Sequence, residues 1–273
     1  MELCPIKKMK GVLMKIRIGL IGFGRTGSIV AKELVSDPAL SLDWVCKRTI
    51  SKDLLYASHS LGFDKKFAPF VSEDKLSKTF LEKNPVDVVI DFSSSSASKL
   101  YLDISNSGSK IVSAISNYTA EQFKYVTEAS KKTAILHSPN ITLGINWLMM
   151  ASKLLQKIIP HADIEVIEEH FRDKKDISGT ALKLATNLNL DPEKHVNSIR
   201  VGGIIGKHEV IFGLPYQTLR LTHESINRAA FGTGAIFASK WLQDKGNGLY
   251  SMDNAIQEKF VKKLLELNEL ENI

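Results

Sequence analysis

The sequence predicts an α/β protein of two domains, in which a parallel sheet covered by helices is followed by an α+β domain with an open mixed sheet. Its 273 residues are enough for two domains. Strand and helix signals alternate through the first half, as is typical of a parallel sheet with helices on both faces. After residue 195 three β-rich runs follow one another closely, which indicates a second sheet.

The first half predicts five strands. The first, KIRIGLIGF, is an apolar run rich in isoleucine, as expected of a strand buried on both faces. A glycine-rich turn and a helix, SIVAKELVSD, follow it. Further helices are expected around 96–107 and 119–132, whereas 50–80 should hold a short helix and irregular connections. The predicted strands are 15–23, 40–46, 86–93, 109–116 and 133–139.

The second half begins after Pro139 with a long helix at 142–159, which Pro160 ends. An alternating strand at 163–171 leads to a helix with Ser178 as its expected N-cap. Three strands follow (HVNSIRVGG, KHEVIFGL and QTLRLTHES), and helices at 227–243 and 251–270 end the chain. The predicted parts are a first domain of 14–139 with 229–273, a second domain of 140–228, and an extension of 1–13.

Composition limits the function classes. The net charge of +6 suits either a nucleic-acid or membrane surface or a protein that binds small anions. Because no run of Lys and Arg exceeds two residues and no basic stripe carries aromatics, small anions are favoured. No apolar run could span a membrane, no signal peptide is evident, and the two cysteines form no disulfide framework. We therefore expect a cytoplasmic protein without nucleic-acid or membrane partners and, since no metal-ligand spacing occurs, without a metal.

A dinucleotide site is predicted at Gly22-Phe23-Gly24-Arg25-Thr26-Gly27, which lies between a strong strand and a helix. The glycines permit a tight turn, and the helix N-terminus favours a pyrophosphate, as in Rossmann-type domains. The second strand ends in Lys47 and Arg48, where NAD sites usually have an acid. Two cations attract a 2′-phosphate, so we expect NADPH to be preferred, with NADH possible. The alternatives are a glycine-rich turn without a ligand and two solvated cations.

Candidate catalytic residues lie in EEHFRDKKDISGTAL (168–182). His170 can donate a proton near neutral pH, and Lys174 can neutralise a neighbouring negative charge. Ser178, Gly179 and Thr180 open a helix, where N–H groups and hydroxyls can hold a carboxylate. The residues alone leave open that this is merely a charged junction between strand and helix. His208 and His223, on predicted strands, are interpreted as structural or solvated.

The sequence also resembles the dihydrodipicolinate reductases (4-hydroxy-tetrahydrodipicolinate reductases) of bacterial lysine and diaminopimelate synthesis. DIEVIEEHFRDKKDISGTAL is similar to the family's E-x-H-H-x-x-K-x-D-A-P-S-G-T-A segment. Four more blocks agree in the same order: VDVVIDFS, SPNITLGIN, RVGGIIGKHEVIF and LTHESINRAAFGTGAIFASKWL. The resemblance implies NAD(P)H-dependent reduction of a cyclic dicarboxylate, a second domain that binds substrate and mediates oligomerisation, and a homotetramer.

The resemblance also implies roles for single residues. His170 and Lys174 are the expected catalytic pair, and His170 would protonate the carbon that becomes electron-rich when hydride adds. Thr142 is expected at the crossover between the domains. The expected substrate-binding residues are Ser178, Gly179, Thr180 and Asn140. The expected cofactor-binding residues are Gly22, Gly24, Arg25, Thr26, Gly27, Lys47, Arg48, Phe92, Ser93, Ser113 and Ser116.

Three departures from the family pattern stand out. Phe171 replaces the second of two adjacent histidines, and Ile177 alone replaces Ala-Pro, which shortens the loop by one residue. The family's Gly-Thr-Thr-Gly is Ser-Ala-Ile-Ser at 113–116. Two further hypotheses therefore stay open: a paralogous reductase of a related imine or enamine acid, and a non-catalytic NADPH-binding protein on the same fold.

Overall fold

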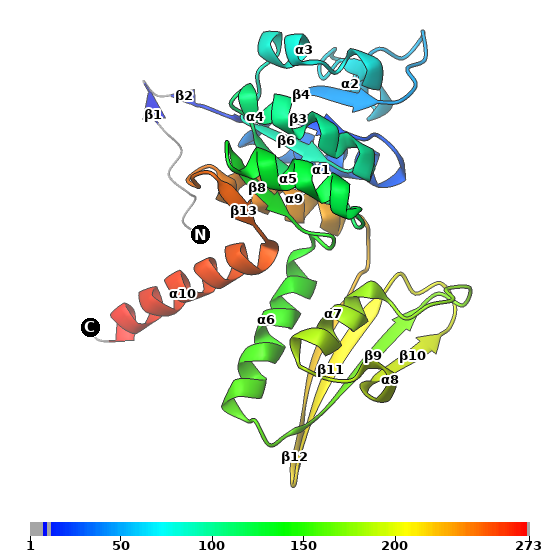
Figure 1. The fold of residues 1–273 in the computed structure, drawn as a ribbon, viewed down its shortest axis with the longest axis vertical. Coiled ribbons are helices and arrows are strands. Elements are labelled where there is room, and N and C mark those ends of the chain that lie inside the picture. The colour runs from blue at the N-terminus through cyan, green and yellow to red at the C-terminus, as the bar shows by residue number, and fades with distance from the viewer. Residues whose placement is uncertain (1–7, 10–11, 272–273) are drawn as a thin grey trace. The chain divides into compact units, whose positions relative to one another are not determined.

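The computed structural model describes residues 8–9 and 12–271, which fold into two compact units (Figure 1). The first unit groups Met1–Ile141 with Phe231–Ala255, and the second groups Thr142–Ala230 with Ile256–Ile273. All of 229–273 is predicted to belong to the first domain. In the structure the last helix, α10 (Met252–Glu271), extends from the first unit into the second. That α10 belongs functionally to the first domain stays a prediction.

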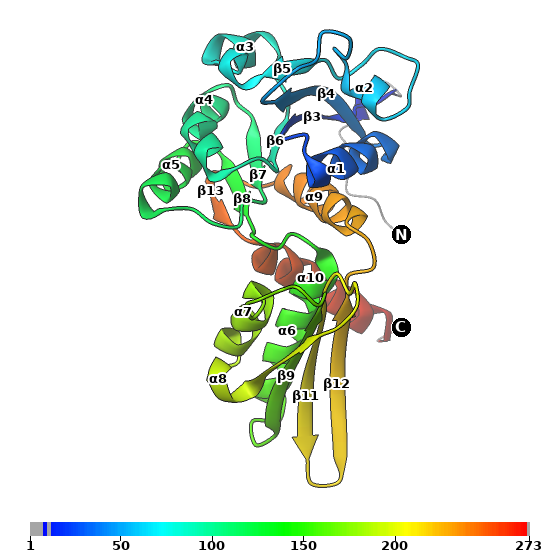
Figure 2. The ribbon, with the colours of Figure 1, turned by 90° about the vertical axis from the view of Figure 1, so that its right-hand side faces the viewer.

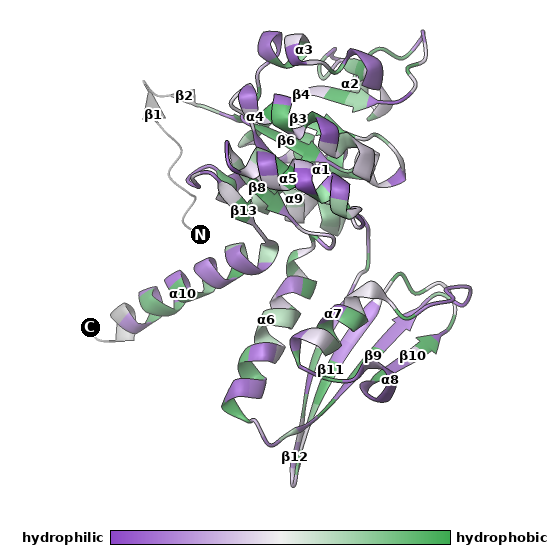
Figure 3. Ribbon diagram, viewed as in Figure 1, coloured by the Kyte–Doolittle hydropathy of each residue, from purple (hydrophilic) through white to green (hydrophobic). Residues whose placement is uncertain are grey.

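The first unit is built on a seven-stranded sheet whose neighbouring strands are all parallel, as the alternating pattern predicted. Figure 3 shows these strands as mostly hydrophobic, which is what burial on both faces requires. From one edge to the other the strands are β13 (Gly248–Tyr250), β8 (Ala134–His137), β7 (Lys110–Ser113), β6 (Val88–Asp91), β3 (Ile16–Ile21), β4 (Leu40–Lys47) and β5 (Phe70–Ser72).

Helices cover both faces of this sheet (Figure 2). One face carries α1 (Arg25–Ser36) and α9 (Ala229–Leu242), which meet where Gly232 packs on Glu33 and Val30. The other carries η2 (Ser95–Leu100), α3 (Lys78–Lys83), α4 (Tyr101–Asn106) and α5 (Ala120–Ser130). Trp44, Tyr101, Ile111 and Ile135 belong to the core between the sheet and this second group. α5 begins with a full capping box between Thr119 and Gln122.

The structure adds elements that the sequence pattern did not predict. Region 50–80 holds the expected short helix, α2 (Ala57–Ser60), but also the strand β5 and η1 (Glu73–Lys75), and α3 begins at its end. The strand β13 was also missed. Both strands have three residues, which is too short for a period of two to be recognised.

The second unit is a four-stranded mixed sheet with helices against it, as predicted. In the order β10-β9-β11-β12, β10 runs parallel to β9 and the other neighbours are antiparallel. Its elements are α6 (Leu143–Ile158), β9 (Asp163–His170), α7 (Gly179–Asn187), α8 (Pro192–His195), β10 (Val196–Arg200), β11 (Lys207–Leu214) and β12 (Gln217–Glu224), followed by most of α10.

Side-chain alternation along β9 determines what this sheet buries. Ile164 and Val166 join the apolar core formed with α6 and α7, and Glu168 and His170 follow on the same face. On this one face of β9, two buried apolar residues are therefore followed by two buried ionisable residues.

The predicted extension contains two short antiparallel strands, β1 (Lys8–Met9) and β2 (Val12–Leu13). Residues 1–7 and 10–11 of that prediction lie outside the described part of the chain. Within residues 8–9 and 12–271, no helix has the length and apolar character needed to cross a bilayer.

Candidate active site

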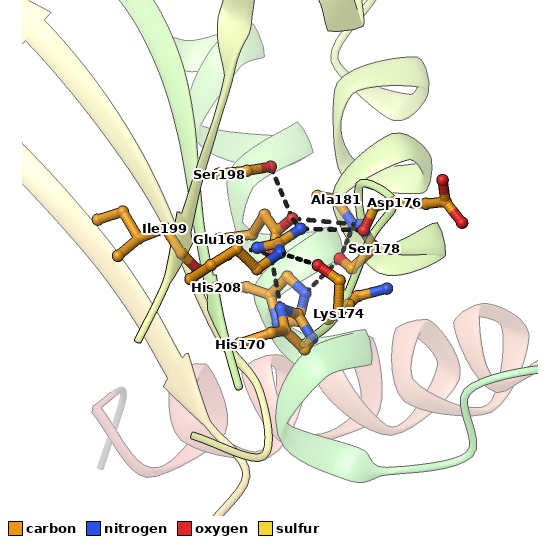
Figure 4. A network of polar contacts seen from close by, with 10 residues as sticks. Glu168, His170, Lys174, Asp176, Ser178, Ala181, Ser198, Ile199 and His208 are labelled. Atoms are coloured by element: carbon orange, nitrogen blue, oxygen red, sulfur yellow. Dashed lines mark hydrogen bonds and ion pairs between the residues drawn. The ribbon is translucent and has the colours of Figure 1, made fainter. Parts of the chain in front are cut away.

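Glu168 is the centre of a buried polar cluster in the second unit (Figure 4). The register of the sheet places Ser198 of β10 and His208 of β11 opposite it. Arg200 binds its carboxylate through two nitrogens, at 2.6 and 3.0 Å, and Ser198 Oγ donates at 2.7 Å. The backbone N–H of Ser178 adds a longer contact at 3.3 Å. Both carboxylate oxygens are thus held by donors from several elements.

These donors determine the charge of Glu168. Burial raises its pKa, but hydrogen bonds from Arg200, Ser198 and His170 outweigh burial and bring the pKa down to about 2. Glu168 is therefore ionised at any pH near neutrality. An ionised carboxylate only accepts hydrogen bonds, so the ring nitrogen that faces it must carry a proton.

His170 is oriented by this carboxylate. Its Nδ1 hydrogen-bonds Glu168 Oε2, which fixes Nδ1 as the protonated nitrogen and leaves Nε2 for chemistry. Nε2 faces Gly206: a Cβ there would lie 3.0 Å from it. The side chain is nearly buried, with 10% of it exposed. A histidine with one nitrogen bound to a buried carboxylate and the other beside a glycine is well placed to donate a proton.

His208 belongs to the same cluster and is buried, so of its two interpretations, structural or solvated, the solvated one is wrong. Its ring lies edge-on to that of His170 at 5.2 Å between centroids, and its Nε2 is 2.8 Å from Ser178 Oγ. Burial, and then the positive charge of His170, lower its pKa to about 4. At neutral pH it is an uncharged partner of Ser178. His223 is half-buried on β12, and burial lowers its pKa.

Ser178 is the N-cap of α7, as predicted, because its Oγ accepts from the N–H of Ala181 at 3.0 Å. The same oxygen bonds His208. The hydroxyl is therefore already engaged on two sides. Gly179 is exposed, and an added Cβ there would meet nothing within 4 Å, so the backbone at the start of α7 remains open to an anion.

The turn between β9 and α7 brings Lys174 close to the cluster. Its N–H donates to the carbonyl of Phe171, and its own carbonyl accepts from Arg200 Nε at 2.9 Å. Lys174 is half-buried, and its ammonium group has no ion-pair partner among the described residues. Its charge contributes to the lowered pKa of His208. Phe171 is 45% exposed. The structure thus brings His170, Lys174 and Ser178 together within one unit.

The glycine-rich turn of the first unit has the shape of a dinucleotide cradle. Gly22 has φ 99°, and a Cβ on Gly27 would lie 2.1 Å from the Gly22 carbonyl oxygen, so neither position tolerates a side chain. Gly24 is the N-cap of α1, with no side-chain capping bond and nothing within 4 Å of an added Cβ. Open space therefore faces uncapped N–H groups at a helix N-terminus, which fits a pyrophosphate.

A cavity of about 420 Å³ adjoins this turn and is lined by Gly22, Gly24, Lys47 and Arg48. Glu73 lines it as well and approaches Arg48 at 3.8 Å. An acid therefore does lie near the two cations in space, because the chain after β5 brings Glu73 from a distant part of the sequence. Lys47 Nζ lies 4.6 Å from the ring centre of Phe70, so this cation is held rather than fully solvated.

A second cavity of about 340 Å³ lies at the carboxyl edge of the same sheet. Thr26, Phe92, Ser93 and Ser116 line it, in agreement with where ligands bind in open α/β sheets. Ser113 does not: it is fully buried, and its hydroxyl lies 2.7 Å from that of Tyr118. The buried Ser113 side chain is therefore not exposed to this cavity.

The remaining expected residues occupy less distinctive places. Arg25 is exposed at the start of α1, and Thr180 is half-buried in α7. The carbonyl of Asn140 accepts from Ser138 Oγ, and Thr142 is the N-cap of α6. Among the described residues, no group of three His, Cys, Asp or Glu side chains could hold a metal ion.

Models of two family domains match this chain. The dihydrodipicolinate reductase N-terminus matches residues 16–141, and the dihydrodipicolinate reductase C-terminus matches residues 144–256. The chain belongs to the dihydrodipicolinate reductase family. The two matches meet close to the division between the two units.

Curated relatives within this family match large parts of the chain. The 4-hydroxy-tetrahydrodipicolinate reductase of Buchnera aphidicola subsp. Cinara cedri is 31% identical over 86% of this chain and 94% of its own length. That of Rickettsia bellii is 38% identical over 61% of this chain and 74% of its own length. A dipicolinate-bound dihydrodipicolinate reductase from Paenisporosarcina sp. TG-14 has the same fold, with a TM-score of 0.73 over 88% of this chain and 99% of its own, at 23% identity.

Four residues of the cluster were missed by sequence reasoning: Glu168, Ser198, Arg200 and His208. One signal was available for Glu168. In DIEVIEEH the apolar residues Ile164 and Val166 fix the buried phase, and Glu168 falls in it. A glutamate in the buried phase of a strand requires a partner, and that requirement points to a nearby arginine.

Proposed function

We propose that this protein reduces 4-hydroxy-tetrahydrodipicolinate with a nicotinamide cofactor, a step of lysine and diaminopimelate synthesis. Membership of the dihydrodipicolinate reductase family supports the reaction class. The observation that carries the proposal is His170, whose Nδ1 is held by an ionised, buried Glu168 and whose Nε2 faces Gly206. This is the arrangement needed for a proton donor of fixed orientation.

The protein residues divide the chemistry between them. A bound nicotinamide supplies the hydride. His170 Nε2 delivers a proton to the substrate carbon that becomes electron-rich, and Glu168 stabilises the ring while it carries positive charge. Lys174, whose ammonium lacks an ion-pair partner in the described chain, balances substrate carboxylate charge. The start of α7 at Gly179 and Thr180 binds one carboxylate.

The role of Ser178 follows from its bonds. In the His208 tautomer whose Nε2 accepts from Ser178, the hydroxyl must turn away from Nε2 in order to donate to a carboxylate. That exchange leaves His208 without its partner, unless its ring takes the other tautomer or a proton. We propose that Ser178 shapes the start of α7 through its capping bond and donates to substrate only with such a change at His208.

We further propose that NADPH is preferred over NADH. Lys47 and Arg48 line the cavity beside the glycine-rich turn and would attract a 2′-phosphate. Glu73 opposes this preference, because its carboxylate lies in the same cavity and competes for Arg48. We therefore expect a moderate preference rather than an exclusive one, with NADH still used. A homotetramer and a cytoplasmic location stay part of this proposal.

The test is an assay with freshly generated pathway intermediate, in which the absorbance of NADPH or NADH is followed. We expect reduction, with a higher kcat/KM for NADPH. In His170→Ala, kcat should fall by about 10²-fold or more, the usual scale of acid catalysis. His161→Ala, which replaces an exposed histidine before β9, is the matched control and should leave kcat unchanged. Equal turnover in His170→Ala would refute the role of His170.

A second candidate is a paralogous reductase of a related imine or enamine acid. It is favoured by Phe171, which is 45% exposed beside the cluster where the family pattern has a histidine. A panel of cyclic imine acids separates the two, because the first proposal requires the dipicolinate intermediate to be the best substrate. Tight NADPH binding without oxidation by any member of the panel would indicate the non-catalytic alternative.

A further inference from the structure

Five polar side chains form one hydrogen-bonded chain at the carboxyl edge of the first unit's sheet. The Tyr101 hydroxyl donates to Asp91 Oδ2 at 2.8 Å and lies 3.0 Å from the Tyr118 hydroxyl. The Tyr118 hydroxyl lies 2.7 Å from Ser113 Oγ, which is 3.4 Å from His137 Nδ1. Asp91, Tyr101 and Ser113 are fully buried. None of these four contacts is used in the proposed chemistry.

Counting protons gives this chain a direction. Each hydroxyl carries one proton. Tyr101 gives its proton to Asp91, so it can only accept from Tyr118, and Tyr118 in turn can only accept from Ser113. Burial raises the pKa of Asp91 to about 6, against the hydrogen bonds from Ser93 and Tyr101 that lower it, so above this pH every proton points toward Asp91. The Ser113 hydroxyl therefore donates its only proton within the protein, to Tyr118, and has none left to donate to a ligand.

The chain connects two loops that line the same cavity. Asp91 Oδ1 accepts from the N–H and the hydroxyl of Ser93, at 2.8 and 2.6 Å, and so holds the loop 92–95. Ser113 ends β7 immediately before the loop 114–117. Both loops line the cavity of about 340 Å³ at the carboxyl edge of the sheet. Tyr118 is the residue whose hydroxyl joins the Asp91 end of the chain to the Ser113 end.

We propose that Tyr118 is a positioning residue for the nicotinamide end of the cofactor. Its hydroxyl fixes the loops 92–95 and 114–117 relative to each other, so that the groups lining the cavity are held before the nicotinamide enters. The inference rests on the proposed function, in which a nicotinamide occupies this edge of the sheet. It also accounts for Ser113–Ser116 in place of the glycine and threonine pattern. The loop 114–117 is held through the hydrogen bond between Ser113 and Tyr118, and not by side chains of the loop itself.

The position of Tyr118 supports this role over that of an ordinary core residue. Its ring packs against Phe123 and His137, at 6.2 and 5.2 Å between centroids, and it is only half-buried. Replacing it with phenylalanine keeps these ring contacts and removes only the hydroxyl. The substitution therefore breaks the link between the two loops without opening a cavity.

The test compares Tyr118→Phe with Tyr125→Phe, the same substitution on α5 outside this chain of hydrogen bonds. Titration calorimetry measures the Kd of NADPH and of 2′-phospho-ADP-ribose, which lacks the nicotinamide. In Tyr118→Phe we expect the Kd of NADPH to rise about fivefold, the usual loss for one hydrogen bond, while the Kd of the fragment stays within about twofold. Tyr125→Phe should change neither. Ser113→Ala, which removes the neighbouring hydroxyl, should reproduce the loss.

Two results would overturn the inference. One is an unchanged Kd for NADPH in both Tyr118→Phe and Ser113→Ala. The other is an equal rise for NADPH and the fragment, which would mean that the chain only stabilises the fold. Because the readout is binding, wild-type protein that binds NADPH but does not reduce the dipicolinate intermediate would refute the proposed function and leave this comparison valid. Wild-type protein that binds no nicotinamide cofactor would refute both.

Discussion

Replacing Glu168 with glutamine should destabilise the second unit by an amount that depends on pH. The pKa of this carboxyl falls from 4.5 to about 2 on folding, and each unit corresponds to about 1.4 kcal/mol. The ionised form therefore contributes roughly 3 kcal/mol at neutral pH. Glutamine keeps the size of the side chain but removes the charge, and Arg200 loses its ion pair. The expected loss in Glu168→Gln is up to this value.

The sign of the pH dependence follows from the lowered pKa. Stability from Glu168 is fully present above its unfolded pKa of 4.5 and is lost as pH falls toward 2. The difference between wild type and Glu168→Gln should therefore be largest at neutral pH and shrink to less than about half near pH 3. Hydrogen exchange of peptides from β9 and β11 measures this difference as a local free energy of opening.

Glu165→Gln is the matched control on the same strand. Glu165 lies on the opposite face of β9, where its side chain is 43% exposed and contacts His195 and Asn197. Its replacement should cost less than about 1 kcal/mol at any pH. The buried carboxylate would not have the predicted effect if Glu168→Gln had the same local free energy of opening as wild type at neutral pH. The same conclusion would follow if the difference between the two proteins were as large near pH 3 as at neutral pH.

Three other predictions concern single positions. Gly206→Ala places a Cβ 3.0 Å from His170 Nε2 and should lower kcat about tenfold, because the ring is slightly displaced. Gly203→Ala is the control: its Cβ would meet nothing within 4 Å, so kcat should stay unchanged. Gly24→Ala should keep the wild-type Tm but raise the Kd of NADPH at least about tenfold in calorimetry, because its Cβ fills the approach to the N-terminus of α1; unchanged binding would exclude this turn as the pyrophosphate site. Glu73→Gln removes a negative charge from the cofactor cavity and should raise the ratio of kcat/KM for NADPH to that for NADH severalfold; an unchanged ratio would exclude an influence of this residue.

The fold was predictable where the chain repeats one period over enough residues. The buried run at β3 and the long helix α6 have clear signals, and both formed close to the predicted bounds. The strands β5 and β13 have three residues each, and each forms only because it pairs with a neighbouring strand, β5 with β4 and β13 with β8. Pairing of this kind is a tertiary effect that no local pattern contains.

The candidate site was predictable only where its residues are close in sequence. His170, Lys174 and Ser178 lie within nine positions and were found together. Arg200 and His208 reach the same cluster through the register of β10 and β11 with β9. Glu73 reaches Arg48 in the same way, through the pairing of β5 with β4. Which strands pair, and in which register, depends on long-range contacts, so these partners appear only in the folded chain.

The alternation along β9 limits where this chain tolerates a change of length. A deletion of one residue ahead of the strand, for instance of Ala162, would shift the register by one and bring Glu165 and Glu169 to the face where Ile164 and Glu168 now lie. The loop that is one residue shorter than in the family pattern lies after the strand, at Ile177, where no register depends on it. Insertions and deletions in related chains should therefore cluster on the α7 side of β9 and be absent from the turn that precedes it.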